Sequence, residues 1–129
     1  MRLEHLALWT PRLEALRDFY VGHFGATAGP VYSSQTRPFR SYFLGFPGGG
    51  RLELMEQPRL EIPPTGAAPD RTGLAHFALT VGNEAEVRGF TERLHAAGVR
   101  VLSEPRRTGD GYYESVVLDP DGNRIEITA

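Results

Sequence analysis

The feature that most constrains this chain is an internal repeat, in which the second half of the sequence reuses the pattern of the first. Residues 3–8 (LEHLAL) lie over residues 74–79 (LAHFAL) at an offset of 71, with four of six positions identical, histidine on histidine among them. Residues 47–54 lie over residues 120–127 at an offset of 73 and match a proline, a glycine, an arginine and a glutamate. Such self-similarity predicts two copies of one supersecondary unit.

Each copy has the pattern of one strand, one helix and then three strands. Apolar runs of strand length open the copies at residues 3–9 and 74–81, and helical patterns follow them. Further strands are expected at residues 29–34, 40–46 and 51–56, and at residues 99–103, 112–118 and 123–128. Tight turns rich in proline and glycine join the last two strands of each copy. The sequence therefore predicts one domain of two βαβββ modules, at residues 1–56 and 73–129, with a proline-bearing connector at residues 57–72.

The two expected helices have recognisable ends. Thr10 and Pro11 supply an N-cap and a first-turn proline for the first helix, and Gly25 is its expected stop. Gly98 is the expected stop of the second helix. The apolar stripes expected to face the core are Leu13, Leu16, Phe19 and Tyr20 in the first helix and Val87, Phe90 and Leu94 in the second.

Composition excludes several classes of function. The formal charge of −2, with dispersed basic residues, does not favour a nucleic-acid partner. No apolar stretch approaches the roughly 20 residues that cross a bilayer, and acidic residues interrupt the N-terminal segment where a signal peptide needs an apolar core. We therefore expect a cytoplasmic protein without a membrane partner. With no cysteine in the chain, a metal site must use nitrogen and oxygen ligands.

Residues of ligand type stand at duplicated positions in the first and last strands of both modules: His5, Glu53, His76 and Glu126. Each glutamate stands between two aliphatic residues, so its carboxylate occupies the opposite face of its strand. Solvent-facing acids and hydrogen-bonded core histidines are the alternative interpretation. Retention of both residue types in both copies favours a site with two histidines and two glutamates, which suits Zn²⁺, Ni²⁺, Co²⁺, Mn²⁺ or Fe²⁺.

Over essentially its whole length the sequence resembles the vicinal oxygen chelate superfamily, which includes glyoxalase I, bleomycin-resistance proteins and extradiol dioxygenases. Residues 119–126 (DPDGNRIE) carry its most recognisable motif, and residues 51–55 (RLELM) are the counterpart in the first half. The resemblance implies an α+β fold in which two tandem βαβββ modules form a cupped, partly open mixed β-sheet with helices outside. Because this superfamily hosts many chemistries, the fold alone does not select one.

The full His-Glu-His-Glu set is most similar to that of glyoxalase I. It implies a metal-dependent lyase or isomerase that acts on a small carbonyl compound through a metal-stabilised enediolate, with Glu53 or Glu126 moving the proton. One divalent ion per site is implied, Ni or Zn first, with Co, Mn or Fe as alternatives. A protein that sequesters an aromatic or antibiotic ligand is the second hypothesis, and an Fe-dependent dioxygenase is the third.

Departures from glyoxalase I bear on the substrate. Trp9 stands where that enzyme commonly has an arginine that grips the glutathione carboxylate, Gln57 stands where an asparagine is expected, and Arg71 is out of register with His76. A substrate other than the glutathione hemithioacetal is therefore expected, with Trp9 as an aromatic wall or, alternatively, a packing residue. Tyr113 is a second candidate for substrate contact. It ends a polar, glycine-containing segment that is interpreted as a mobile flap over the site or, alternatively, as an ordinary surface hairpin loop.

The resemblance also bears on assembly. In this family modules often pair across subunits, so His5 and Glu53 of one chain would meet His76 and Glu126 of the other. Each module forms half of the cupped sheet and leaves apolar edges exposed, which an isologous twofold interface would cover. We therefore expect a homodimer with shared sites. The connector is long enough for closure within one chain as well.

Overall fold

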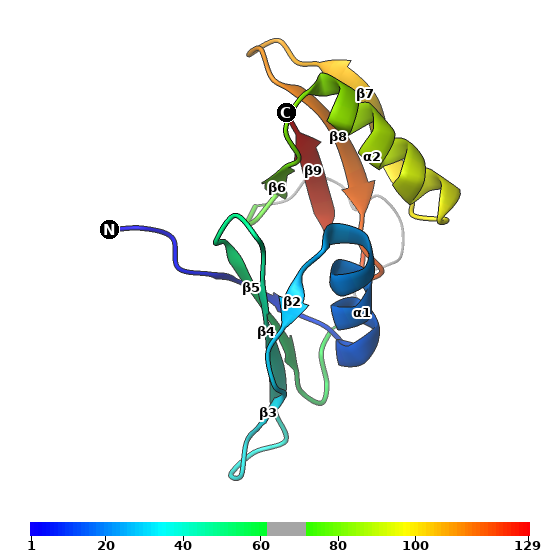
Figure 1. Cartoon of the computed structure of the whole chain (residues 1–129). Helices are drawn as coiled ribbons and strands as arrows, with labels where there is room; N and C mark the ends of the chain where they lie inside the picture. Colours follow the sequence, from blue (N-terminus) through cyan, green and yellow to red (C-terminus); the bar gives the residue numbers. More distant parts are fainter. Residues whose placement is uncertain (62–71) are drawn as a thin grey trace. The chain divides into compact units, whose positions relative to one another are not determined.

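The computed structural model describes residues 1–61 and 72–129, and these fall into two compact units, Met1–Pro63 and Pro64–Ala129. Each unit holds one α-helix and one β-sheet, so the α+β class predicted from the sequence is confirmed (Figure 1). Most of the expected connector, residues 62–71, lies outside the described residues. No helix in the described ranges is long and apolar enough to cross a bilayer.

The first unit follows the predicted order of one strand, one helix and further strands. Its elements are β1 (Leu6–Trp9), α1 (Leu13–Phe24), β2 (Thr27–Ala28), β3 (Tyr32–Ser33), β4 (Arg40–Gly45) and β5 (Arg51–Glu56). The sheet order is β1-β5-β4-β2, with β3 also paired to β4. The strand expected at residues 29–34 is confirmed only in part, because β3 covers two residues of that range and the other short strand, β2, precedes it. Pro30 lies between them, and its missing N–H cannot continue a strand ladder.

Helix α1 covers one face of the first sheet. Its buried residues Leu13, Leu16 and Tyr20 pack toward β4 and β5. The sheet contributes Leu44, Leu52 and Leu54, none more than 3% exposed. Alternation along each strand then places the intervening residues of β1, β4 and β5 on the opposite face. That second face carries the candidate site residues.

The start of α1 differs from the sequence prediction. The helix begins at Leu13 with Arg12 in the N-cap position, where it has no side-chain cap. The hydroxyl of Thr10 instead accepts a hydrogen bond from the Arg12 N–H at 3.0 Å, which closes a turn before the helix. The predicted stop is confirmed, since Gly25 takes a left-handed conformation at φ 65° and ends the helix.

The second unit repeats the arrangement with its own elements. These are β6 (Phe77–Thr80), α2 (Glu84–Ala96), β7 (Val101–Arg107), β8 (Tyr113–Leu118) and β9 (Arg124–Thr128). The sheet order is β6-β9-β8-β7. Helix α2 starts with a full capping box, in which Asn83 accepts from the N–H of Glu86 and the Glu86 carboxylate accepts from the N–H of Asn83.

The core of the second unit contains a polar pair that the apolar stripe does not predict. Helix α2 buries Val87, Thr91 and Leu94, whereas the expected Phe90 is only partly buried. The spacing of four and then three residues centres the buried face of the helix on Thr91. The Thr91 hydroxyl lies 2.6 Å from that of Ser115 on β8, and both residues are at most 2% exposed. A buried hydroxyl is stable there because each has the other as a hydrogen-bond partner.

Candidate metal centre

Strand pairing explains why a histidine and a glutamate meet in each unit. The first strand of each unit runs parallel to the last, with Ala7 opposite Glu53 and Ala78 opposite Glu126. Residues two apart in an extended chain share a face, so His5 and His76 lie on the same side as these glutamates. Both histidines precede their strands, because β1 and β6 begin later than the predicted residues 3 and 74.

In the first unit, His5 Nε2 lies 3.7 Å from Glu53 Oε2. The Glu53 side chain is 17% exposed and the His5 side chain 35%. In the second unit, His76 Nε2 lies 3.2 Å from Glu126 Oε2, with side-chain exposures of 44% and 18%. The structure thus brings the predicted ligands together in pairs, one pair in each unit. Within residues 1–61 and 72–129, no group of three or more potential metal ligands is found.

The donor types and spacing of these pairs fit a divalent ion. Two donors that each lie about 2.1 Å from one ion stand about 3.0 to 3.4 Å apart at octahedral or tetrahedral angles. The 3.2 Å separation in the second unit is within that range, and the 3.7 Å separation in the first unit is slightly wider. Imidazole nitrogen with carboxylate oxygen is a donor combination typical of Zn, Ni, Co, Mn and Fe sites. Each unit therefore holds one histidine and one glutamate whose donor types suit such an ion.

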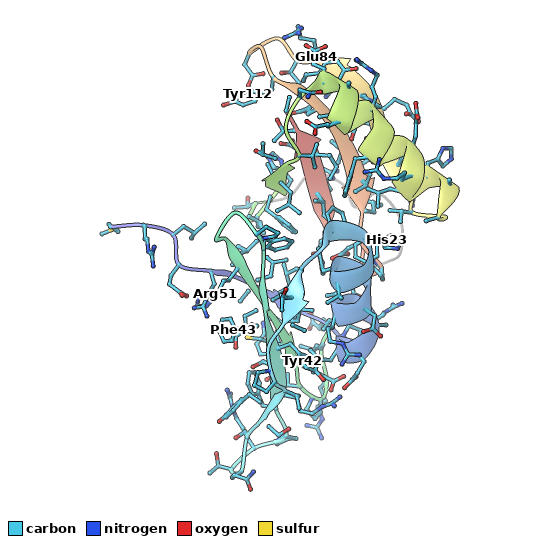
Figure 2. All side chains as sticks on the ribbon, in the orientation of Figure 1. His23, Tyr42, Phe43, Arg51, Glu84 and Tyr112 are labelled. Atoms are coloured by element: carbon cyan, nitrogen blue, oxygen red, sulfur yellow. The ribbon has the colours of Figure 1, made fainter. Side chains whose placement is uncertain are left out.

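Further charged and aromatic groups surround His5. Its Nδ1 atom contacts a carboxylate oxygen of Glu4, and the other Glu4 oxygen accepts from the Arg51 guanidinium. That guanidinium stacks over the Phe43 ring at 4.6 Å, and the Phe43 ring meets the His5 ring edge to face at 5.3 Å. Figure 2 shows Arg51 and Phe43 side by side in the first unit. The sequence prediction missed these neighbours, although Glu4 adjoins the histidine directly.

Glu126 has a different electrostatic setting. Partial burial raises the pKa of its carboxyl group; nearby Glu114 also raises it, while His76 and Arg106 act in the opposite direction. Glu114 is 12% exposed and pairs with Arg106 at 3.2 Å. The sequence prediction also missed Glu114. Alternation along β8 could have revealed it, because Val116 pairs with Glu126 and Glu114 lies two residues away on the same face.

The predicted substrate contacts lie in different places. By strand alternation Trp9 shares the face of His5 and Glu53; it is 46% exposed, and its ring meets that of Phe39 edge to face at 6.2 Å. Tyr113 shares the helix-covered face of β8, where its hydroxyl accepts from Arg88 on α2 at 2.8 Å. Substrate contact by Tyr113 stays a prediction. Arg71 lies outside the described residues.

A separate groove of about 570 Å³ lies at the ends of β4 and β5 in the first unit. Its lining includes Phe39, Arg40, Glu56 and Gln57 but neither His5 nor Glu53. Arg40 donates to Glu56 at 3.0 Å and to Glu14 on α1 at 2.7 Å. The hydrogen bond from Arg40 lowers the pKa of the exposed Glu14 carboxyl. These ion pairs link α1 to the sheet.

Comparisons with known proteins agree with the fold. The sequence profile described as Glyoxalase/Bleomycin resistance protein/Dioxygenase superfamily matches residues 2–127. The uncharacterized protein YqjT of Bacillus subtilis is 39% identical over 62 residues, which cover 46% of this chain and 48% of that protein.

Two solved structures have the same fold. The glyoxalase family protein from Enterococcus faecalis superposes with a TM-score of 0.80 at 23% identity, covering 99% of this chain and 97% of that one. Glyoxalase I from Zea mays superposes with a TM-score of 0.78 at 22% identity, covering 98% of this chain. This chain spans 44% of the maize protein.

Proposed function

Because the chain belongs to the glyoxalase/bleomycin resistance protein/dioxygenase superfamily, we propose that it is a metal-dependent lyase or isomerase of glyoxalase I type. Its substrate is a small carbonyl compound. One observation carries the proposal: each unit places a histidine nitrogen within 3.7 Å of a glutamate oxygen, by the same pairing of its first and last strands. An accidental surface contact would have no reason to recur at duplicated positions.

The carboxylates supply the acid–base chemistry of the proposed reaction. A divalent ion, when bound, supplies positive charge beside the substrate's carbonyl oxygen and so eases proton removal from the neighbouring carbon. Where that neighbouring carbon carries a hydroxyl group, Glu53 or Glu126 accepts its C–H proton and returns it to the former carbonyl carbon, while the hydroxyl proton passes to the other oxygen, so the product is an isomer of the bound compound. The two carboxylates are 17% and 18% exposed, so each contacts solvent and the abstracted proton can exchange with it.

Duplication in the sequence supports the proposal that both pairs serve one ion. A single histidine and a single glutamate leave a divalent ion with too few protein ligands, whereas two such pairs give four. We propose that the protein is a homodimer in which His5 and Glu53 of one chain share an ion with the partner's His76 and the partner's Glu126. Ni or Zn is the proposed metal, since the four-ligand set is most similar to that of glyoxalase I.

The surroundings of the first pair favour an apolar or aromatic substrate over a glutathione adduct. Trp9 offers a ring on the His5 face, at the position where a glutathione-binding arginine would stand. An indole ring does not grip a carboxylate, but it packs well against an aromatic or aliphatic group. The same exposed ring is the observation that favours the second candidate function, a protein that sequesters an aromatic ligand without chemistry.

Metal analysis combined with a proton-exchange assay tests the proposal. Protein purified without added metal is analysed for Ni, Zn, Co, Mn and Fe, and is then incubated with phenylpyruvate in deuterium oxide. Proton NMR should show exchange of the hydrogens beside the 2-oxo group faster than in buffer alone, and removal of the metal by a chelator should return the rate to that of buffer. Methylglyoxal with glutathione should be turned over poorly, because Trp9 provides no cationic grip.

The alternatives give different results in the same experiment. Trp9 is the single tryptophan of the chain. If phenylpyruvate quenches its fluorescence, and the protein holds no metal and catalyses no exchange, the protein is a binding protein and not a lyase. Stoichiometric iron with oxygen consumption would replace it by a dioxygenase. Efficient formation of lactoylglutathione would retain the metal-dependent reaction and overturn the proposed substrate preference.

A further inference from the structure

Among the residues that the structure describes, a carboxylate lies at the second ring nitrogen of His5 but none lies at that of His76. The His5 ring has Glu53 on the Nε2 side and Glu4 on the Nδ1 side. At the position equivalent to Glu4, the second module has Ala75, whose methyl group accepts no hydrogen bond. Val116 stands at the position equivalent to Phe43. The contacts around His5 therefore cannot be reproduced around His76.

We propose that Glu4 is a positioning residue that holds the His5 ring with Nε2 directed toward Glu53. A carboxylate beside Nδ1 accepts a hydrogen bond from the Nδ1–H group, so the proton of neutral imidazole stays on Nδ1 and the lone pair on Nε2. That lone pair is the one that a metal ion on the Glu53 side would use. The inference rests on the proposed metal site, and it makes the first half-site preorganised where the second is not.

Three contacts keep Glu4 in place. Arg51 lies on β5 two residues before Glu53, and its guanidinium donates to the Glu4 carboxylate. The same guanidinium stacks on Phe43, whose edge-to-face contact with His5 completes a ring of four side chains. Because Glu4 is about half exposed, its contact with His5 would be weak and mobile without this support. Arg51 and Phe43 therefore hold the Glu4 carboxylate beside Nδ1 of His5.

The tautomer of His5 in metal-free protein gives a direct test. Long-range proton–nitrogen NMR at pH 8 distinguishes a protonated Nδ1 from a protonated Nε2 for each neutral histidine. We expect His5 to carry its proton on Nδ1, and we expect Glu4→Ala to abolish that preference. His76 is an internal control, because its state should not change. An unchanged His5 tautomer in Glu4→Ala would overturn the proposal.

Metal affinity gives the second readout. Competition titration with Zn²⁺ should show binding weaker by about 10- to 100-fold in Glu4→Ala, the usual effect of removing a hydrogen-bond partner of a ligating histidine. Glu4→Gln should recover part of this loss, since an amide oxygen still accepts from Nδ1. Glu92→Gln removes an exposed charge from α2 and should bind Zn²⁺ as the native protein does.

The outcomes separate this inference from the proposed function. Native protein that binds Zn²⁺ no more tightly than Glu4→Ala would overturn the role of Glu4 while leaving the metal site intact. Native protein that fails to bind any of the divalent ions would overturn the proposed function, and the tautomer measurement would still decide whether Glu4 orients His5. Equal loss of affinity in Glu4→Gln and Glu92→Gln would assign the effect to overall charge and reject positioning.

Discussion

The two units hold the same pair of residues in different surroundings. In the first unit, His5 is supported by Glu4, and Glu53 lies 3.7 Å from it. In the second, His76 has an alanine at the equivalent position and lies 3.2 Å from Glu126, which has the second acidic residue Glu114 nearby. The backbone pairing that brings His and Glu together is thus common to both units. The neighbouring groups that orient these residues and set their electrostatic surroundings are specific to each unit.

The helix–sheet contacts differ in a similar way. Tyr20 in α1 is fully buried, and the repeat offset of 71 places Thr91 at the equivalent position in α2. One unit thus fills this position with an aromatic ring, and the other with a hydroxyl that pairs with Ser115. The comparison teaches that the repeat preserves the βαβββ order and the ligand positions, while packing and electrostatics have diverged around them.

Mixing two variants should give the largest effect and test whether the two half-sites meet across chains. His5→Ala and Glu126→Ala should each lose most metal binding and activity alone, because each removes a ligand from every site. A mixed dimer with shared sites would have one site lacking both ligands and one intact site. Metal binding and proton exchange should therefore partly recover after subunit exchange. No recovery, with exchange confirmed by mass spectrometry, would place each complete site within one chain.

Replacement of Thr91 by Val should have a smaller effect, confined to stability. The change leaves the buried Ser115 hydroxyl without its partner, which should lower the free energy of unfolding by about 1–3 kcal/mol. The double variant Thr91→Val with Ser115→Ala should recover much of this loss, because neither polar group remains. Urea unfolding measures both. Thr80→Val, at an exposed threonine of β6, is the matched control, and an equal loss there would contradict the importance of the buried pair.

The smallest expected effect concerns pH and Glu126 in metal-free protein. The raised pKa means that the folded state disfavours the ionised carboxylate. Ionisation therefore costs stability, and the cost develops as pH rises from the ordinary glutamate pKa, about 4.3, through the raised folded value. Glu126→Gln should be more stable than the native protein near pH 7, by about 1 kcal/mol or less, and this advantage should disappear near pH 4.

Thermal or urea unfolding across this pH range checks the Glu126 prediction. Glu92→Gln should show no such pH-dependent gain, because it changes an exposed residue outside the site. A stability advantage of Glu126→Gln that grows toward acid pH would contradict the prediction that ionised Glu126 destabilises the folded state. Zn²⁺ binding by native protein should weaken over the same acid range, since protons compete with the metal for the Glu126 carboxylate.

Much of each sheet could be predicted from local patterns. Strand β5 stands at its predicted residues 51–56, and Gly25 ends α1 as predicted. Period-two alternation and a glycine in left-handed conformation are local signals, which do not depend on distant contacts. The predictions that failed depend on neighbouring structure. Thr10 closes a turn instead of capping α1, and Thr91 replaces Phe90 at the centre of the buried helix face.

The sequence by itself determined the duplicated βαβββ order, the family and the two pairs of candidate ligands, because repeats and residue types are properties of the chain. Only the tertiary structure decided what surrounds those ligands. Arg51 reaches Glu4 across 47 positions of sequence, and Glu114 reaches the face of Glu126 through the pairing of β8 with β9. Such contacts depend on strand register and side-chain direction, which the folded sheet sets.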